Sequence, residues 1–130
     1  MALNHDPQER HARKRRRAAH DRSVSAFRIM WTIVMFDLPT LEEEDKRSYR
    51  AFRNTLMEMG FTMFQFSVYG RCSPSEEKAD ALGAQLQRII PFYGQVRILK
   101  ITDRQFAKML IFEGKMRREP ENAPQQLTFF

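Results

Sequence analysis

The stretch that decides the fold is Trp31-Thr-Ile-Val-Met-Phe-Asp-Leu-Pro-Thr40. Its first six residues are almost entirely apolar and rich in β-forming types, which predicts a buried β-strand. Asp37 follows directly, and Pro39 ends the strand because proline lacks the backbone N–H that a sheet ladder needs. Thr40 and Glu43 have the spacing of a capping box, which predicts that a helix begins here.

Helical spacing continues beyond this point. Apolar residues recur every three or four positions over about 43–59, and the expected buried stripe comprises Tyr49, Phe52, Leu56 and Met59. Gly60 stands where helices commonly end. Residues 61–72 then alternate apolar and polar side chains and crowd aromatic ones, which predicts one strand or a bent pair of strands.

The second half of the chain also carries periodic apolar patterns. A second helix is expected over about 75–90, with an inner face of Ala79, Leu82, Leu86, Ile89 and Ile90. Residues 95–101 alternate cleanly and predict a strand with one face toward solvent. The remaining chain is expected to form a helical turn over 102–109, a strand over 110–113, a polar linker over 115–126 and renewed strand character over 126–130.

This order of elements is typical of an α+β, ferredoxin-like βαββαβ fold with an antiparallel sheet. Both helices would cover one face of the sheet and leave the opposite face without cover from this chain. We therefore expect a second copy to cover it in a symmetric homodimer. The apolar Leu127–Phe130 would form an extra C-terminal strand, which needs a sheet edge to pair with.

The positive charge is concentrated at the start of the chain. The net charge is +6, and residues 1–28 contribute eight Lys or Arg against three Asp or Glu. We expect a disordered basic extension over 1–28, either a solvated tail or a contact to a polyanion. A ferredoxin-like domain over 29–114 and a linker with the C-terminal strand over 115–130 should follow. Because residues 29–130 are nearly balanced in charge, bulk charge does not itself indicate nucleic acid.

Cysteine content and hydropathy bear on the location of the protein. Cys72 is the sole cysteine, which rules out an internal disulfide and is typical of a reducing cytosol. No apolar run is long enough to span a bilayer, and the basic run at 13–17 lacks the apolar segment of a signal peptide. We expect a cytoplasmic protein with no membrane contact.

Asp37 is the first candidate for chemistry. A carboxylate at the end of a strand is a suitable ligand for Mg²⁺, which typically takes one or two protein carboxylates together with water and phosphate. Two copies of Asp37 facing each other across a dimer axis would supply such a pair. The alternative is a turn or capping residue beside Pro39. All three histidines precede residue 21, so the folded part offers no histidine as a general base.

Basic side chains suggest a place for a phosphate backbone. The candidates for nucleic-acid binding are Lys46, Arg47, Arg50 and Arg53 on the first helix, with Arg71 at the end of the following strand. The alternative is a solvated helix face balanced by the acidic residues at 42–45. Phe64, Phe66 and Tyr69 could stack on bases, although such residues more often belong to a core or a dimer interface.

Several motifs in order resemble a known family. They are Thr32–Thr40, Tyr49–Arg53, Leu56–Phe61, Gln65–Tyr69 and Gly94–Phe106. Together these segments resemble the second family of CRISPR-associated proteins ("Cas two"), in particular the variety found beside single-effector systems. The resemblance covers about residues 30–130.

The resemblance implies a ferredoxin-like homodimer whose C-terminal strand joins the partner's sheet. It implies a Mg²⁺-dependent endonuclease acting on single-stranded RNA or, in some members, duplex DNA, with Asp37 as the metal-linked catalytic acid. It also implies a role in spacer acquisition, in which the protein binds duplex DNA and bridges dimers of the CRISPR adaptation integrase. The chain departs from the family at Pro39, where many relatives carry a second acid, and in residues 1–28.

Two other functions remain open on the same fold. A toxin-type ribonuclease would cause growth arrest that depends on Asp37. A purely structural DNA-binding scaffold would keep full integration without cleavage. The presence of a repeat–spacer array and an integrase gene beside this one would exclude the toxin.

Overall fold

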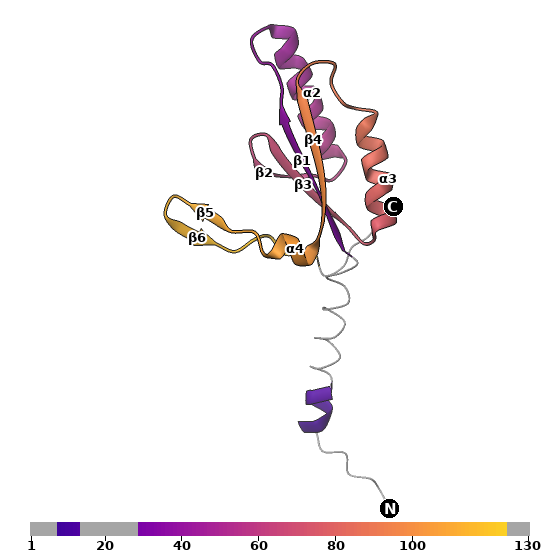
Figure 1. Cartoon of the computed structure of the whole chain (residues 1–130), viewed down its shortest axis with the longest axis vertical. Helices are drawn as coiled ribbons and strands as arrows, with labels where there is room; N and C mark the ends of the chain where they lie inside the picture. Colours follow the sequence, from indigo (N-terminus) through magenta and orange to yellow (C-terminus); the bar gives the residue numbers. More distant parts are fainter. Residues whose placement is uncertain (1–7, 14–28, 125–130) are drawn as a thin grey trace, which may run out of the picture.

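The computed structural model describes residues 8–13 and 29–124. Its elements in chain order are β1 (Met30–Asp37), α2 (Glu43–Glu58), β2 (Thr62–Gln65), β3 (Val68–Ser73), α3 (Glu76–Gln87), β4 (Gln95–Thr102), α4 (Asp103–Ala107), β5 (Ile111–Glu113) and β6 (Met116–Arg118) (Figure 1). The predicted strand over 61–72 is the bent pair β2 and β3. The expected final strand over 126–130 and most of the N-terminal extension lie outside the described residues.

Four strands form one antiparallel sheet in the order β2-β3-β1-β4. The helices α2 and α3 lie together on one face of it (Figure 1). This arrangement confirms the predicted ferredoxin-like βαββαβ fold. The first strand lies between β3 and β4, and one of its faces packs against the helices while the other packs against Phe106, so both faces are largely screened from water. That central position explains why its sequence is an unbroken apolar run rather than an alternating one.

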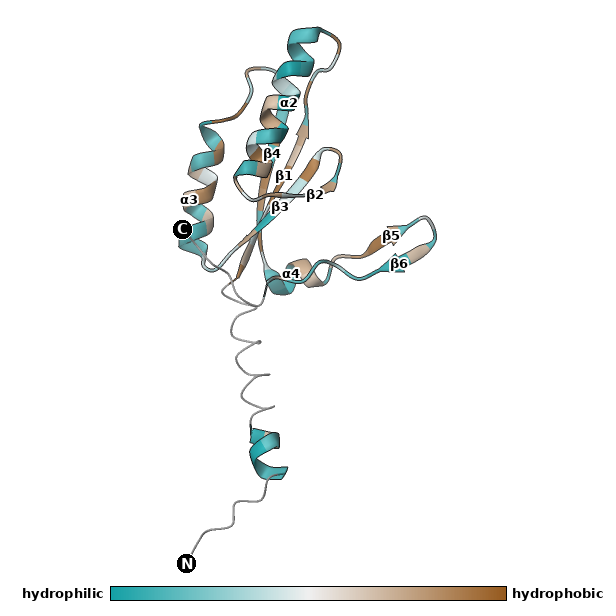
Figure 2. Cartoon of the chain, turned by 180° about the vertical axis from the view of Figure 1, so that it is seen from behind, coloured by the Kyte–Doolittle hydropathy of each residue, from teal (hydrophilic) through white to brown (hydrophobic). Residues whose placement is uncertain are grey.

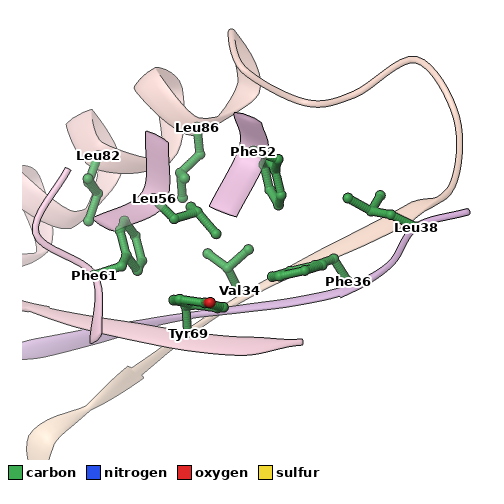
Figure 3. Packing of buried hydrophobic residues seen from close by; sticks show 9 residues of the cluster. All are labelled: Val34, Phe36, Leu38, Phe52, Leu56, Phe61, Tyr69, Leu82 and Leu86. Atoms are coloured by element: carbon green, nitrogen blue, oxygen red, sulfur yellow. The ribbon is translucent and has the colours of Figure 1, made fainter. Parts of the chain in front are cut away.

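The helix-covered face carries the larger core. Val34, Phe36 and Tyr69 point from the strands toward the helices, where they meet side chains of α2 and α3 (Figure 3). The helix side chains of this cluster are Phe52, Leu56, Leu82 and Leu86. The predicted inner faces are therefore confirmed for these residues. Ile90 is half-exposed because α3 ends at Gln87 and the chain turns away before reaching it.

The predicted start of α2 at about residue 43 is confirmed, but its capping residues differ from the prediction. The N-cap is Glu42, not Thr40, and the backbone N–H of Glu42 donates to the Asp45 carboxylate at 3.2 Å. The expected capping box at Thr40 and Glu43 is therefore wrong. The box that forms has the same spacing but lies two residues later, at Glu42 and Asp45. The prediction for Gly60 is confirmed, since it has a φ of 85° and its N–H donates to the Met57 carbonyl.

The opposite face of the sheet is partly covered from within the chain. Phe106 of α4 is fully buried and stacks on Trp31 with ring centroids 4.1 Å apart. The Trp31 indole N–H also donates to Asp103 at 2.7 Å. The expectation that this face has no internal cover is therefore wrong near the start of β1. Farther along this face, Leu99, which is paired with Ile33, remains 47% exposed.

A small hairpin of β5 and β6 extends from α4 away from the sheet (Figure 2). It occupies part of the region predicted as a polar linker, which is therefore wrong over Met116–Arg118. The pairing is held in part by Arg118, whose guanidinium bonds to Glu113 at 2.7 Å and Glu121 at 2.8 Å. Among the described residues, no helix is long and apolar enough to cross a bilayer.

Candidate functional site at the end of the central strand

Asp37 is the last residue of the central strand and is exposed. Successive side chains of a strand point to opposite faces, so Asp37 lies on the face of Trp31 and Met35 rather than the face of Val34 and Phe36. Since α2 and α3 cover the latter face, Asp37 lies on the opposite side of the sheet, which α4 covers near Trp31, at the other end of β1. A carboxylate placed there is open to a second molecule.

The backbone around Asp37 is held from two sides. On one side, the Phe36 N–H donates to the Ser67 carbonyl at 3.0 Å. On the other, Gly94 has a φ of 94°, and a Cβ at this position would lie 2.6 Å from the Asp37 carbonyl oxygen. Only glycine adopts this left-handed backbone without steric cost and also leaves room for the Asp37 carbonyl oxygen. Gly94 therefore sets how closely the chain before β4 approaches Asp37.

This contact leads to a test with a matched control. Gly114 also has a positive φ, of 63°, but a Cβ there would meet nothing within 4 Å. Replacing either glycine by Ala costs about 1–2 kcal/mol for the left-handed backbone. We expect Gly94→Ala to lose at least about 1 kcal/mol more, from the added steric overlap. Urea unfolding of both variants measures the difference, and equal losses would contradict the proposed contact.

The metal-binding capacity of one chain is small. Among the described residues, no group of three or more Asp, Glu, His or Cys side chains is placed to hold a metal ion. Asp37 thus offers a single carboxylate, with Pro39 in place of a second acid nearby. Mg²⁺ accepts one or two protein carboxylates when water and phosphate complete its shell. The carboxylate of Asp37 could therefore hold Mg²⁺ only together with ligands from outside this chain.

The predicted basic side chains of α2 are exposed but lie in another layer. A rotation of about 100° per residue places them within about a third of the helix circumference, away from Phe52 and Leu56. They are Lys46, Arg47, Arg50 and Arg53, here called the α2 strip. Lys46 forms a surface ion pair with Glu43 at 3.2 Å. Because α2 covers the face opposite Asp37, the structure does not bring the α2 strip and Asp37 together.

Arg71 has a structural partner. Its guanidinium donates to the Met59 carbonyl at 2.6 Å and lies over Gly60 at the C-terminus of α2. A cation there satisfies an orphan carbonyl and interacts favourably with the helix dipole. Arg71 is thus remote from Asp37, which lies near the start of the same helix. Its predicted contact with nucleic acid stays a prediction.

The three aromatic candidates for base stacking differ in how far they are buried. Tyr69 is fully buried in the core, so its predicted alternative role in stacking is wrong. Phe64 packs against the rings of Trp31 and Phe106. Phe66, by contrast, is 83% exposed in the turn between β2 and β3. Its carbonyl accepts a hydrogen bond from the Tyr49 hydroxyl at 3.2 Å, which fixes this turn beside the end of β1.

Arg97 is a candidate that the sequence analysis missed. Asp37 is paired with Gln95 in the sheet, and Met35 with Arg97. Arg97 therefore lies on the face of Asp37 as its diagonal neighbour, at a usual separation of about 7–8 Å. Its Nε donates to Gln95 Oε1 at 3.1 Å. The clean alternation of residues 95–101 could have identified Arg97 once the strand pairing was known.

Comparison with known proteins gives a consistent family. The family model described as CRISPR associated protein Cas2 matches residues 30–109, which is more than half of the chain. The chain is 37% identical over 107 residues to a CRISPR-associated endoribonuclease Cas2 of Paracidovorax avenae, covering 82% of this chain and 99% of the relative. A protein of the same name from Parvibaculum lavamentivorans is 43% identical over 101 residues, covering 78% and 100%.

A third relative comes from another organism. The CRISPR-associated endoribonuclease Cas2 of Flavobacterium psychrophilum is 36% identical over 111 residues, covering 85% of this chain and 96% of the relative. The matched region holds the whole four-stranded sheet, both covering helices and Asp37. The resemblance inferred from the motifs is thereby confirmed. The chain belongs to the Cas2 family of CRISPR-associated proteins.

Proposed function

We propose that this chain acts as a homodimer that holds nucleic acid during CRISPR adaptation and hydrolyses phosphodiesters at a Mg²⁺ site built on Asp37. The observation that carries the proposal is an exposed carboxylate at the end of the central strand, on the face opposite α2 and α3. Relatives named as endoribonucleases support the activity. Cleavage of single-stranded RNA and duplex DNA, with and without Mg²⁺, tests it.

The proposed site needs two chains. A two-fold axis near the end of β1 would bring two copies of Asp37 together, and the pair would hold one Mg²⁺. Such an ion, when bound, lowers the pKa of a coordinated water and offsets the charge of the phosphate under attack. Arg97, on the same face, would hold a phosphate oxygen through its guanidinium. Uncovered apolar surface around Leu99 favours a partner protomer on this face.

Family membership supports a proposal for the wider assembly. We propose that the integrase of CRISPR adaptation is the protein partner, with this chain bridging integrase dimers around duplex DNA in the cytoplasm. Leu127–Phe130 would pair with the partner's sheet, for which β4 offers an edge with no strand beyond it among the described residues. This edge runs the full length of Gln95–Thr102, so it can accept a short additional strand.

The α2 strip would contact the DNA backbone away from Asp37. Replacing both Arg50 and Arg53 by Gln is expected to weaken duplex binding and to reduce the slope of log K against log salt by about 1.8 per protomer, because each lost phosphate contact removes about 0.9. Lys78→Gln with Arg88→Gln removes the same charge from exposed positions of α3 and its C-cap and serves as the control. Equal slopes for the two double variants would remove the α2 strip from the interface.

A scaffold without turnover is the second candidate function. It is favoured by Pro39 and by the single carboxylate that each chain offers. A spacer-integration assay with Asp37→Ala separates the two functions. Integration at the wild-type rate together with lost cleavage would assign the biological role to the scaffold. Loss of both would make the Asp37 site part of integration itself.

A further inference from the structure

A groove lies beside the end of β1, on the helix-covered side of the sheet. It has a volume of about 520 Å³ and runs between the first turns of α2 and the segment that joins α3 to β4. Its lining includes Leu38, Pro39, Glu44, Asp45, Phe92 and Tyr93. The buried Leu38 follows Asp37 directly, so the groove and the exposed carboxylate lie on the two sides of one strand end.

The groove is bordered by aromatic side chains that the described chain leaves in solvent. Phe92 is 100% exposed and Tyr93 is 74% exposed. The contact of Gly94 with the backbone of Asp37 and Leu38 anchors this segment next to them. The aromatic residues are therefore presented by a fixed turn. Adjacent exposed aromatic side chains on a groove are a common mark of an interaction surface.

The groove is negatively charged, which favours a basic occupant. Glu44 and Asp45 line it, and its lining residues include no Lys or Arg. The α2 strip, which would offset these charges, lies mainly on the other side of the helix. A phosphate backbone would meet repulsion here, whereas Lys or Arg side chains would gain charge-assisted hydrogen bonds to the carboxylates.

We propose that this groove is a docking site for a protein segment that carries Lys or Arg beside an apolar side chain. The apolar side chain packs against Phe92 and Tyr93, and the basic one pairs with Glu44 or Asp45. This inference does not depend on the proposed nuclease, because it uses neither Asp37 nor a metal. A segment seated here would contact Leu38 and Pro39, and could thereby bias the position of the adjoining Asp37.

The test uses a random peptide display library selected against the full chain. We expect the selected peptides to combine a basic residue with a neighbouring aliphatic or aromatic one. Their affinity should fall about tenfold or more with Phe92→Ala plus Tyr93→Ala, as for other interface anchors. Glu44→Lys should weaken the same peptides by a comparable factor. Because Phe92 is fully exposed, its truncation removes no core packing, and an unchanged urea midpoint verifies the fold.

The control is Phe112→Ala, which truncates an exposed aromatic residue on β5 and should leave peptide affinity unchanged. Three results would overturn the proposal: selected peptides without basic residues, equal affinity for the wild type and the Phe92/Tyr93 variant, or displacement of the peptides by duplex DNA that depends on Phe92. Self-association abolished by Phe92→Ala would assign the groove to a second copy instead.

Discussion

Asp37→Asn is expected to abolish Mg²⁺-dependent cleavage of RNA and DNA while leaving the fold unchanged. The substitution keeps the shape of the side chain but removes the charge that a divalent cation needs. Replacing a residue that only supports a metal ligand typically lowers metal affinity or activity by about 10- to 100-fold. Replacing the ligand itself should therefore lower the cleavage rate by more than about 100-fold. The side chain is exposed, so stability should remain within about 0.5 kcal/mol of the wild type.

A matched control isolates the position of the carboxylate. Glu58→Gln neutralises another exposed acid, at the far end of α2, and should retain the wild-type rate. Single-turnover cleavage at saturating Mg²⁺ measures both variants. Equal rates for Asp37→Asn and the wild type would show that any nuclease activity of this chain resides elsewhere.

Phe106→Ala is expected to cost about 3–5 kcal/mol of unfolding free energy, the usual range for truncating a fully buried Phe. Phe106 contacts the rings of both Trp31 and Phe64, so its loss leaves a cavity between α4 and the sheet. Truncation would also weaken the cover that α4 gives to the otherwise helix-free face. Urea unfolding at one fixed protein concentration measures the loss, because an oligomer's stability depends on concentration.

Phe66→Ala provides the comparison for this measurement. It removes the same side chain from a position that is 83% exposed, and the hydrogen bond of this turn uses the Phe66 backbone carbonyl. We expect a change within about 0.5 kcal/mol. A loss below about 1 kcal/mol for Phe106→Ala would mean that α4 does not pack on the sheet as described.

Much of the fold could be predicted from the sequence because its elements carry strong local signals. The apolar run of β1 and the stripe on α2 each reflect one burial pattern. The alternation of β4 predicted the strand itself, but Ile98 and Leu99 are both exposed although they lie on opposite faces. The cover of Trp31 by Phe106 could not be predicted, because it joins residues far apart in the chain and has no periodicity. The start of α2 was predicted correctly, but its capping box was not, because two overlapping boxes compete and the sequence alone does not rank them.

The candidate site was predictable only in part. Asp37 stands out in the sequence because it ends an apolar strand. The structure shows which face of the sheet its side chain lies on, because side chains alternate between the two faces along β1. Arg97 becomes a neighbour only through the pairing of β1 with β4, which is long-range information. Arg71 looked like a free cation in the sequence, yet it bonds the end of α2. A basic residue can stabilise the C-terminus of a helix through its carbonyl groups and the helix dipole, and the residue type alone does not reveal this role.

The central claim is that two copies of Asp37 share one divalent cation. Isothermal titration of the full-length protein with Mg²⁺, for the wild type and for Asp37→Ala, tests this claim most directly. We predict one ion per two chains for the wild type and loss of this binding in the variant. Equal Mg²⁺ binding by the two proteins would contradict it.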